Sequence, residues 1–328
     1  MHRRLFLGLL AVGAARAGGA AAQPAAGPHR VGILAPTGAP PASDPHSATG
    51  SLPKYLEELG YVRGQNLILE QRYAAGRLED LPAMARDLVR LRLHAIVTIG
   101  SSATRAARAA TSTVPIVMLG NFDPIAIGLV KSLAKPEANL TGVLIAPAGT
   151  LAGKKLELLK EAVPRATRIA FLTHEDPGLR AQERETQAAA AMLGVTLTLT
   201  RLRGGDYEGA FVTMMAGRPD ALFVAASTYF MRDRKQIIEL AARHRLPAIY
   251  EWPEQVQDGG LMSYGGDLER TTRRVAEYVD RILKGARPGD LPIEQPTALQ
   301  LVINLKTARA LGLSLSQGLV ARADRVIE

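Results

Sequence analysis

The stretch VPIVMLGNFDPIAIGLVKSLAKP, residues 114–136, decides the fold because it joins an apolar run to a polar loop. The apolar run ends at Gly120 and has the composition of a buried strand. Asn121, Asp123 and Pro124 follow, and an apolar helical pattern begins after the proline. Pro124 suits the first turn of that predicted helix, since its missing N–H has no partner there. The carboxylate at the end of a buried strand therefore needs a functional or structural explanation.

Short apolar runs alternate with helical patterns along the chain. The predicted strands cover residues 30–36, 66–73, 94–100, 114–120, 168–173, 195–200, 220–226, 247–251 and 260–265. Further helices are predicted over 77–91, 153–163 and 267–285, each with its aliphatic residues near one face. Asp267 is the expected N-cap of the last of these. This alternation predicts an α/β protein with parallel sheets and helices on both faces.

The strand–helix alternation occurs in two similar series. Four units precede residue 145, and a second series runs from 168 to 265. Two α/β lobes of this kind would meet at a cleft. Ligands in open α/β sheets bind outside the carboxyl ends of the strands. We therefore expect Asn121 and Asp123 to face that cleft as ligand-binding residues.

Other strand ends carry further candidates for ligand binding. Ser101 and Ser102 open a predicted helix, where they either cap it or offer hydroxyl and N–H groups to an anion. Aromatic residues at strand ends are either packing or the wall of a site for a small organic ligand. The remaining candidates lie close to other strand ends and are Thr37, His174, Thr228, Tyr229, Tyr250 and Tyr264.

The composition excludes several functional classes. The 328 residues include no cysteine, which excludes disulfides, thiolate metal sites and a cysteine nucleophile. The six histidines are not spaced as metal ligands, so no metal and no cofactor is expected. No hydrolase or phosphate-loop motif is present, so the chain is not expected to be an enzyme. The basic residues are scattered among acids, which argues against nucleic-acid binding.

The N-terminus predicts export. Arg3 and Arg4 precede an apolar run over residues 5–15, and small-residue sites follow. This pattern is typical of a signal peptide over residues 1–22, cleaved after Ala22 or after Ala17. The arginine pair also resembles the twin-arginine export signal. Without the three arginines of this segment, the net charge falls from +9 to +6. A mildly basic exterior favours binding to an anionic ligand or a membrane surface. The export signal predicts that the mature protein is located in the periplasm.

Several long blocks resemble one known family. They are ELGYVRGQNLILEQRYAAGRLEDLPAMARDLVRL (58–91), HAIVTIGSSAT (94–104), TSTVPIVMLGNFDPIAIGLVKSLAKPEANLTGV (111–143), GKKLELLKEAVP (153–164), ELAARHRLPAIYE (239–251), GGLMSYG (259–265) and GDLPIEQPTALQLVINLKTARALGL (289–313). Over residues 30–328 the chain resembles the ABC transporter substrate-binding family related to the tryptophan- and tyrosine-binding lipoproteins of bacteria.

The resemblance implies a type I periplasmic-binding-protein fold, with two Rossmann-like lobes and a hinge of three crossovers. The crossovers are expected near 143–147, 264–268 and 288–296. The N-terminal lobe would comprise residues 29–145 and 266–290, and the C-terminal lobe residues 146–265 and 291–328. No cysteine follows the signal peptide, so no lipid anchor is expected.

The implied function is that of a periplasmic solute-binding protein of an ABC importer. It would capture an amino acid or related carboxylate by hinge closure, with its carboxylate at residues 101–102 and its ammonium at Asp123. The implied partners are the permease and ATPase subunits of the inner membrane, and the protein itself is expected to be a monomer. The alternatives are a ligand-sensing subunit for a membrane signalling partner and a periplasmic hydrolase, for which the sequence offers no recognisable nucleophile and base.

Overall fold

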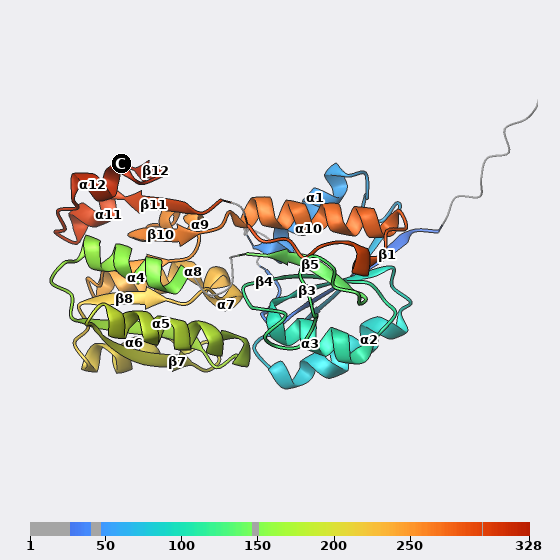
Figure 1. Cartoon of the computed structure of the whole chain (residues 1–328), viewed down its shortest axis with the longest axis horizontal. Helices are drawn as coiled ribbons and strands as arrows, with labels where there is room; N and C mark the ends of the chain where they lie inside the picture. Colours follow the sequence, from blue (N-terminus) through green and yellow to red (C-terminus); the bar gives the residue numbers. More distant parts are fainter. Residues whose placement is uncertain (1–26, 41–46, 146–150, 297) are drawn as a thin grey trace, which may run out of the picture.

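Two sheets of mostly parallel strands, each flanked by helices, form the two halves of the molecule (Figure 1). The computed structural model describes residues 27–40, 47–145, 151–296 and 298–328. The predicted signal peptide lies outside these residues. Within the described part of the chain, no helix is long and apolar enough to cross a membrane.

The first sheet has five parallel strands in the order β2-β1-β3-β4-β5. They are β1 (His29–Ala35), β2 (Leu67–Tyr73), β3 (Ala95–Ile99), β4 (Ile116–Gly120) and β5 (Leu140–Leu144). Every residue of β3, β4 and β5 is buried, as expected for a sheet with both faces covered.

Two pairs of helices cover the two faces of the first sheet (Figure 1). The first pair is α1 (Ala48–Glu58) with α10 (Leu268–Leu283), and the second is α2 (Leu81–Arg90) with α3 (Gly100–Ala110). Short 3₁₀ turns, η1 (Leu78–Asp80) and η3 (Pro288–Asp290), precede α2 and follow α10. Asp267 caps α10 by accepting a hydrogen bond from the N–H of Arg270, so this predicted N-cap is confirmed.

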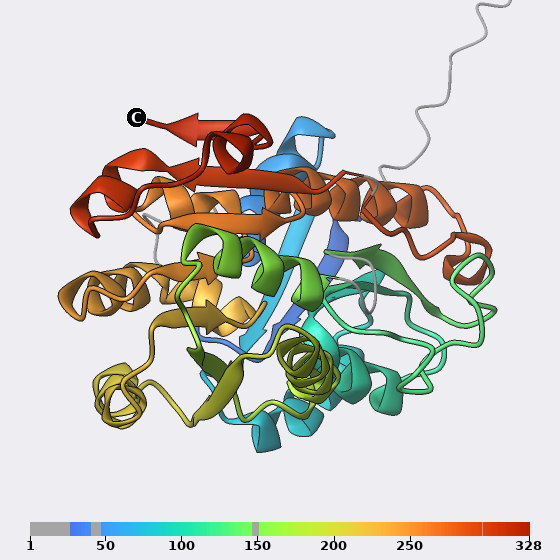
Figure 2. The same cartoon turned by 60° about the vertical axis from the view of Figure 1, so that its left-hand side comes forward.

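The second sheet has seven strands in the order β12-β11-β10-β9-β8-β6-β7. They are β6 (Arg168–His174), β7 (Thr196–Leu202), β8 (Ala221–Val224), β9 (Ala248–Tyr250), β10 (Met262–Gly265), β11 (Gln300–Asn304) and β12 (Arg325–Ile327). All neighbouring pairs are parallel except β10 and β11. Figure 2 brings this sheet and its helices in front of the first sheet.

Helix α4 precedes the first strand of the second sheet, and helices or 3₁₀ turns of the second half follow most of its other strands. They are α4 (Leu151–Ala162), η2 (Pro177–Leu179), α5 (Arg180–Met192), α6 (Tyr207–Ala216), α7 (Thr228–Arg232), α8 (Arg234–Arg243), α9 (Pro253–Gln257), α11 (Leu305–Ala310) and α12 (Gln317–Ala321). Helices α4 and α5 contact each other, as do α6 and α8. This arrangement confirms the predicted α/β class, with parallel sheets flanked by helices.

The chain passes between the two sheets three times. It leaves the first sheet after β5 and returns after β10, within the ranges expected for the first two crossovers. The third passage lies between Glu294 and β11 and overlaps the end of the range expected for it. Residues 291–294, expected in the second lobe, lie against the first sheet. Thr141 Oγ1 donates a hydrogen bond to the Leu291 carbonyl over 2.9 Å, and Glu294 forms a parallel bridge with Val143.

The helix predicted after Pro124 does not form. Residues 121–139 make a series of turns instead. The N–H of Leu129 bonds the Pro124 carbonyl over 2.9 Å, but Gly128 has a left-handed backbone with φ of +74° and ends the turn. Because the backbone leaves the helical region there, the apolar spacing that predicted a helix packs a loop against the α2–α3 side of the sheet.

Candidate functional site

The carboxyl ends of strands from both sheets face each other where the two halves meet. Helix α3 begins there after β3, α7 begins after β8, and the loop after β6 carries Asp176. These segments enclose a cavity of about 40 Å³, called here the polar cavity. Its polar lining residues are Ser101, Asn121, Asp176, Ser227 and Thr228.

The first turn of α3 presents backbone N–H groups at this cavity. Gly100 lines the cavity, and its φ of +78° is accessible because glycine has no Cβ. Thr104 Oγ1 donates a hydrogen bond to the Gly100 carbonyl over 2.7 Å and fixes this turn. No side chain caps the start of α3, so its N–H groups and positive dipole end suit an anionic group.

Asp176 places a carboxylate opposite α3. Its side chain is 7% exposed, and Oδ1 accepts hydrogen bonds from the N–H of Gly178 over 2.8 Å and from Ser102 Oγ over 2.7 Å. The second bond connects the two halves of the molecule. The polar cavity therefore combines an anion-binding helix end with a buried carboxylate, a pair of groups complementary to a zwitterion.

A glycine allows the two halves to approach this closely. Gly178 lies against Ser101, and a Cβ at position 178 would stand 1.8 Å from Ser101 Oγ and 2.9 Å from its Cβ. Rotation of the serine side chain would not remove the second clash. Any larger residue at position 178 would therefore force the halves apart.

Tyr229 forms part of the wall and is supported from behind by His174. The two rings stack with centroids 3.9 Å apart and an interplanar angle of 6°. Burial lowers the pKa of His174, so the imidazole is neutral at neutral pH. Its Nδ1 accepts the N–H of Asp176 over 3.3 Å, which places the proton on Nε2. The Tyr229 hydroxyl donates to the Pro36 carbonyl of the other half over 3.4 Å.

A second cavity of about 30 Å³, called here the apolar cavity, adjoins the first. Ile145, Thr228 and Trp252 line both cavities. The apolar cavity is completed by residues that include Thr37, Ile99, Met231 and Leu268. Trp252 is 1% exposed, and its indole Nε1 has no hydrogen-bond partner within the described chain. Trp252 and Met231 pack in the core of the first half, although Met231 belongs to α7 and Trp252 to the loop after β9, both in the second half.

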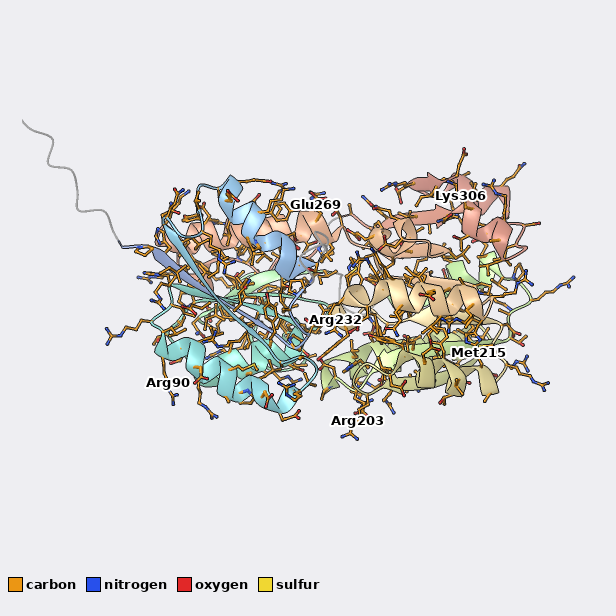
Figure 3. All side chains as sticks on the ribbon, turned by 180° about the vertical axis from the view of Figure 1, so that it is seen from behind. Arg90, Arg203, Met215, Arg232, Glu269 and Lys306 are labelled. Atoms are coloured by element: carbon orange, nitrogen blue, oxygen red, sulfur yellow. The ribbon has the colours of Figure 1, made fainter. Side chains whose placement is uncertain are left out.

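Arg232 adds a positive charge at the edge of the apolar cavity, close to where the two halves meet (Figure 3). Its guanidinium forms two hydrogen bonds of 2.6 Å to the neighbouring Asp233 carboxylate. This ion pair raises the pKa of Arg232 further. Because Asp233 balances the charge, Arg232 does not make this end of the cleft a strong anion site.

The structure brings together most of the residues expected from the sequence. Ser101, Asn121, Thr228 and Tyr229 line the polar cavity, and Thr37 and Thr228 line the apolar cavity. Ser102 reaches the site through its bond to Asp176, and His174 through its stacking on Tyr229.

Three expected residues lie elsewhere. Asp123 Oδ1 caps the local turn by accepting the N–H groups of Ile125 over 2.8 Å and Ala126 over 3.1 Å, and it lines neither cavity. Tyr250 lines a different cavity within the second half. Tyr264 lies in β10, packed against the core of the second half.

The main residues that the sequence analysis missed are Asp176 and Trp252. Asp176 precedes a proline at a strand end, as Asp123 does, so the signal for it was present in the sequence. The described residues include no cluster of three histidines or carboxylates able to hold a metal ion.

Comparisons with known proteins agree on one family. A family model described as ABC transporter substrate binding protein matches residues 43–327. The tyrosine-binding protein of Clostridioides difficile strain R20291 is 25% identical over 260 residues, which cover 79% of this chain and 74% of that protein.

Solved structures share the fold of this chain. A conserved domain protein from Vibrio cholerae O1 biovar El Tor is 26% identical, with a TM-score of 0.79 over 91% of this chain and 99% of that one. The ABC domain from Streptococcus pneumoniae, solved in complex with L-Trp, is 24% identical, with a TM-score of 0.78 over 92% of this chain and 100% of that one.

Proposed function

The chain belongs to the ABC transporter substrate-binding protein family, and we propose that it captures an amino acid with an apolar, preferably aromatic, side chain between its two lobes. Its fold is the type I periplasmic-binding-protein fold. The observation that carries the proposal is the pairing of the Asp176 carboxylate with the uncapped first turn of α3 in one cavity.

The polar cavity would hold the two charged groups of the ligand. The ligand carboxylate would accept hydrogen bonds from the first N–H groups of α3 and from the hydroxyls of Ser101 and Thr228. The ligand ammonium would pair with Asp176. Asp176 takes the role that the sequence analysis gave to Asp123, because it lines the cavity and Asp123 does not.

The apolar cavity would receive the ligand side chain. Trp252 stands between the two cavities, so a ligand with its charged groups at Asp176 would direct its side chain along the indole. Ile99, Met231 and Leu268 supply further apolar surface. The ligands named for two relatives, tyrosine and L-Trp, support an aromatic side chain for this ligand.

Capture would require the lobes to move. Cavities of about 40 and 30 Å³ hold only a few water molecules, so an amino acid enters only when the halves separate. The three crossovers would serve as the hinge, and closure would then enclose the ligand. We propose that the exported protein is a periplasmic monomer that delivers its ligand, chemically unchanged, to the permease and ATPase of an importer.

Isothermal titration calorimetry with the twenty L-amino acids and a panel of organic acids tests this function. We expect binding of an aromatic or large aliphatic amino acid, with the ammonium required. Asp176→Asn should weaken binding by about 2–5 kcal/mol, because a buried charge loses its partner. Asp123→Asn is the matched control and should retain affinity. Absence of binding by every amino acid in the panel would contradict the proposed ligand class.

A further inference from the structure

A third cavity, called here the distal cavity, lies within the second half and is larger than the other two. It has a volume of about 300 Å³ and shares no lining residue with the polar or the apolar cavity. It is bounded by α8, the residues around β9, the loop before β10, and α11. Its apolar walls include Ile238, Ala241, Leu246, Leu261 and Leu311.

A hydroxyl group without a protein partner opens onto this cavity. Tyr250 lines it and is 1% exposed, and its side chain forms no hydrogen bond with any of the described residues. Burial raises the pKa of Tyr250, so the phenol keeps its proton. Gly260 leaves room for the ring, since a Cβ there would stand 2.7 Å from Tyr250 Cε2. A hydroxyl that faces a cavity without a protein partner can bond a polar atom of a ligand.

The rim of the distal cavity is positively charged. Arg245 and Lys306 line it, both are exposed, and neither forms an ion pair within the described chain. The lining contains no aspartate or glutamate. Figure 3 shows Lys306 on the α11 segment at the outer end of the second half. Thr307 Oγ1 donates to the Gly259 carbonyl over 2.9 Å and ties α11 to the loop that closes the cavity.

We propose that the distal cavity binds a small carboxylic acid with an aromatic or branched aliphatic body. The carboxylate would lie between Arg245 and Lys306, and the body would pack on Ile238, Leu261 and Leu311. A polar atom at its far end would bond the Tyr250 hydroxyl. A zwitterion fits poorly, because the lining offers no carboxylate for an ammonium. The ligand therefore differs in charge from the amino acid proposed for the cleft.

Methyl-detected NMR of the full mature chain with 3-(4-hydroxyphenyl)propionate tests this site. This probe has a carboxylate, an apolar ring and a hydroxyl, but no ammonium. We expect saturable shifts at the methyl groups of Ile238, Leu246, Leu261 and Leu311. Tyr250→Phe should raise the Kd by roughly two- to tenfold, the effect of one net hydrogen bond. Lys306→Gln should also raise it.

A blocking variant and a control variant test whether the shifts arise from binding in the distal cavity. Ala310→Trp fills the cavity from an exposed position on α11 and should abolish the shifts. Ala109→Trp places the same side chain at an exposed position of α3 and should leave them unchanged. Asp176→Asn should also leave them unchanged, because the cleft is not involved. The proposal is overturned if the four methyl groups do not shift, if only Ile99 and Ile145 beside the cleft shift, or if Ala310→Trp binds as tightly as the wild type.

Discussion

Ser102 Oγ donates a hydrogen bond of 2.7 Å to Asp176 Oδ1, and this single bond joins the first helix turn of one lobe to a strand-end loop of the other. Ser102 belongs to α3, beside the uncapped N–H groups, while Asp176 supplies the only carboxylate among the described residues that line the polar cavity. A zwitterion bound between them would use the same carboxylate and the same helix end. Under the proposed function, lobe closure and ligand binding would therefore depend on one set of groups.

Closure should fail when residue 178 carries a side chain. In Gly178→Ala, the new Cβ would overlap Ser101, and the lobes would close incompletely. We expect a loss of ligand affinity of about tenfold or more, equivalent to at least about 1.4 kcal/mol. Calorimetry measures the affinity, and small-angle scattering measures the radius of gyration with and without ligand. Gly205→Ala is the matched control, since no heavy atom lies within 4 Å of a Cβ there. Equal affinity in both variants would contradict this account of closure.

Ligand binding should change the intrinsic fluorescence of the protein. Trp252 is the only tryptophan in the sequence, and it lines both cavities of the cleft. We expect titration with L-phenylalanine, L-tyrosine or an aliphatic amino acid that binds to alter its emission intensity and maximum. Trp252→Phe should abolish the signal. A ligand that binds by calorimetry without any change in the emission would place its site away from Trp252.

The stability of the second lobe should respond to the ionisation of Glu254. Burial raises the pKa of Glu254 to about 7, and its Oε2 has no hydrogen-bond partner among the described residues. The native state therefore holds a proton that the unfolded chain loses above pH 4.5, and this contribution to stability disappears as the pH rises through 7.

Glu254→Gln should remove that pH dependence. We expect the free energy of unfolding of the variant to match that of the wild type at pH 5 and to exceed it at pH 8 by about 2–3 kcal/mol. This difference corresponds to the raised pKa of Glu254 in the native state. Urea unfolding at the two pH values measures the difference. A constant difference between variant and wild type from pH 5 to pH 8 would show that Glu254 does not titrate in this range.

Substitutions of the two members of a buried ion pair, at the carboxyl edge of the second sheet, should have strongly coupled effects on stability. Lys155 Nζ lies 2.6 Å from Glu251 Oε2, with both side chains 1% exposed, and also lies 4.6 Å from the centroid of the Phe223 ring. Lys155→Met should destabilise the protein by about 3–5 kcal/mol, because Glu251 remains as a buried, uncompensated charge. The double variant Lys155→Met/Glu251→Met should recover most of this loss. Additive effects of the two single substitutions, measured by urea unfolding, would argue against the coupling.

The sequence was sufficient to predict strands β1 to β4 and β6 to β10 and the sheet edge at which the candidate site lies, whereas β5, β11 and β12 were not among the predicted strands. Parallel strands bring their carboxyl ends to one edge, so Ser101, Thr228 and Tyr229 could be expected together before any coordinates were known. The helix after Pro124 could not be predicted correctly, because its apolar spacing is compatible with a turn once Gly128 adopts a left-handed backbone.

The choice between two aspartates also needed the structure. Asp123 and Asp176 each precede a proline after a strand, and each accepts N–H groups of its own turn. Only Asp176 lies opposite Ser102, a long-range contact that no local pattern encodes. The positions of Tyr250 and Trp252 also needed the structure, since the Tyr250 ring lines the distal cavity while Trp252, two residues later, lines the cleft.

A crystal structure with the tightest-binding amino acid tests the central claim most directly. We expect the ligand between the lobes, with its ammonium within hydrogen-bond distance of Asp176 and its carboxylate at the N–H groups of Gly100, Ser101 and Ser102. Its side chain should lie against Trp252. A ligand bound outside this cleft, or one whose ammonium contacts neither Asp176 oxygen, would contradict the account.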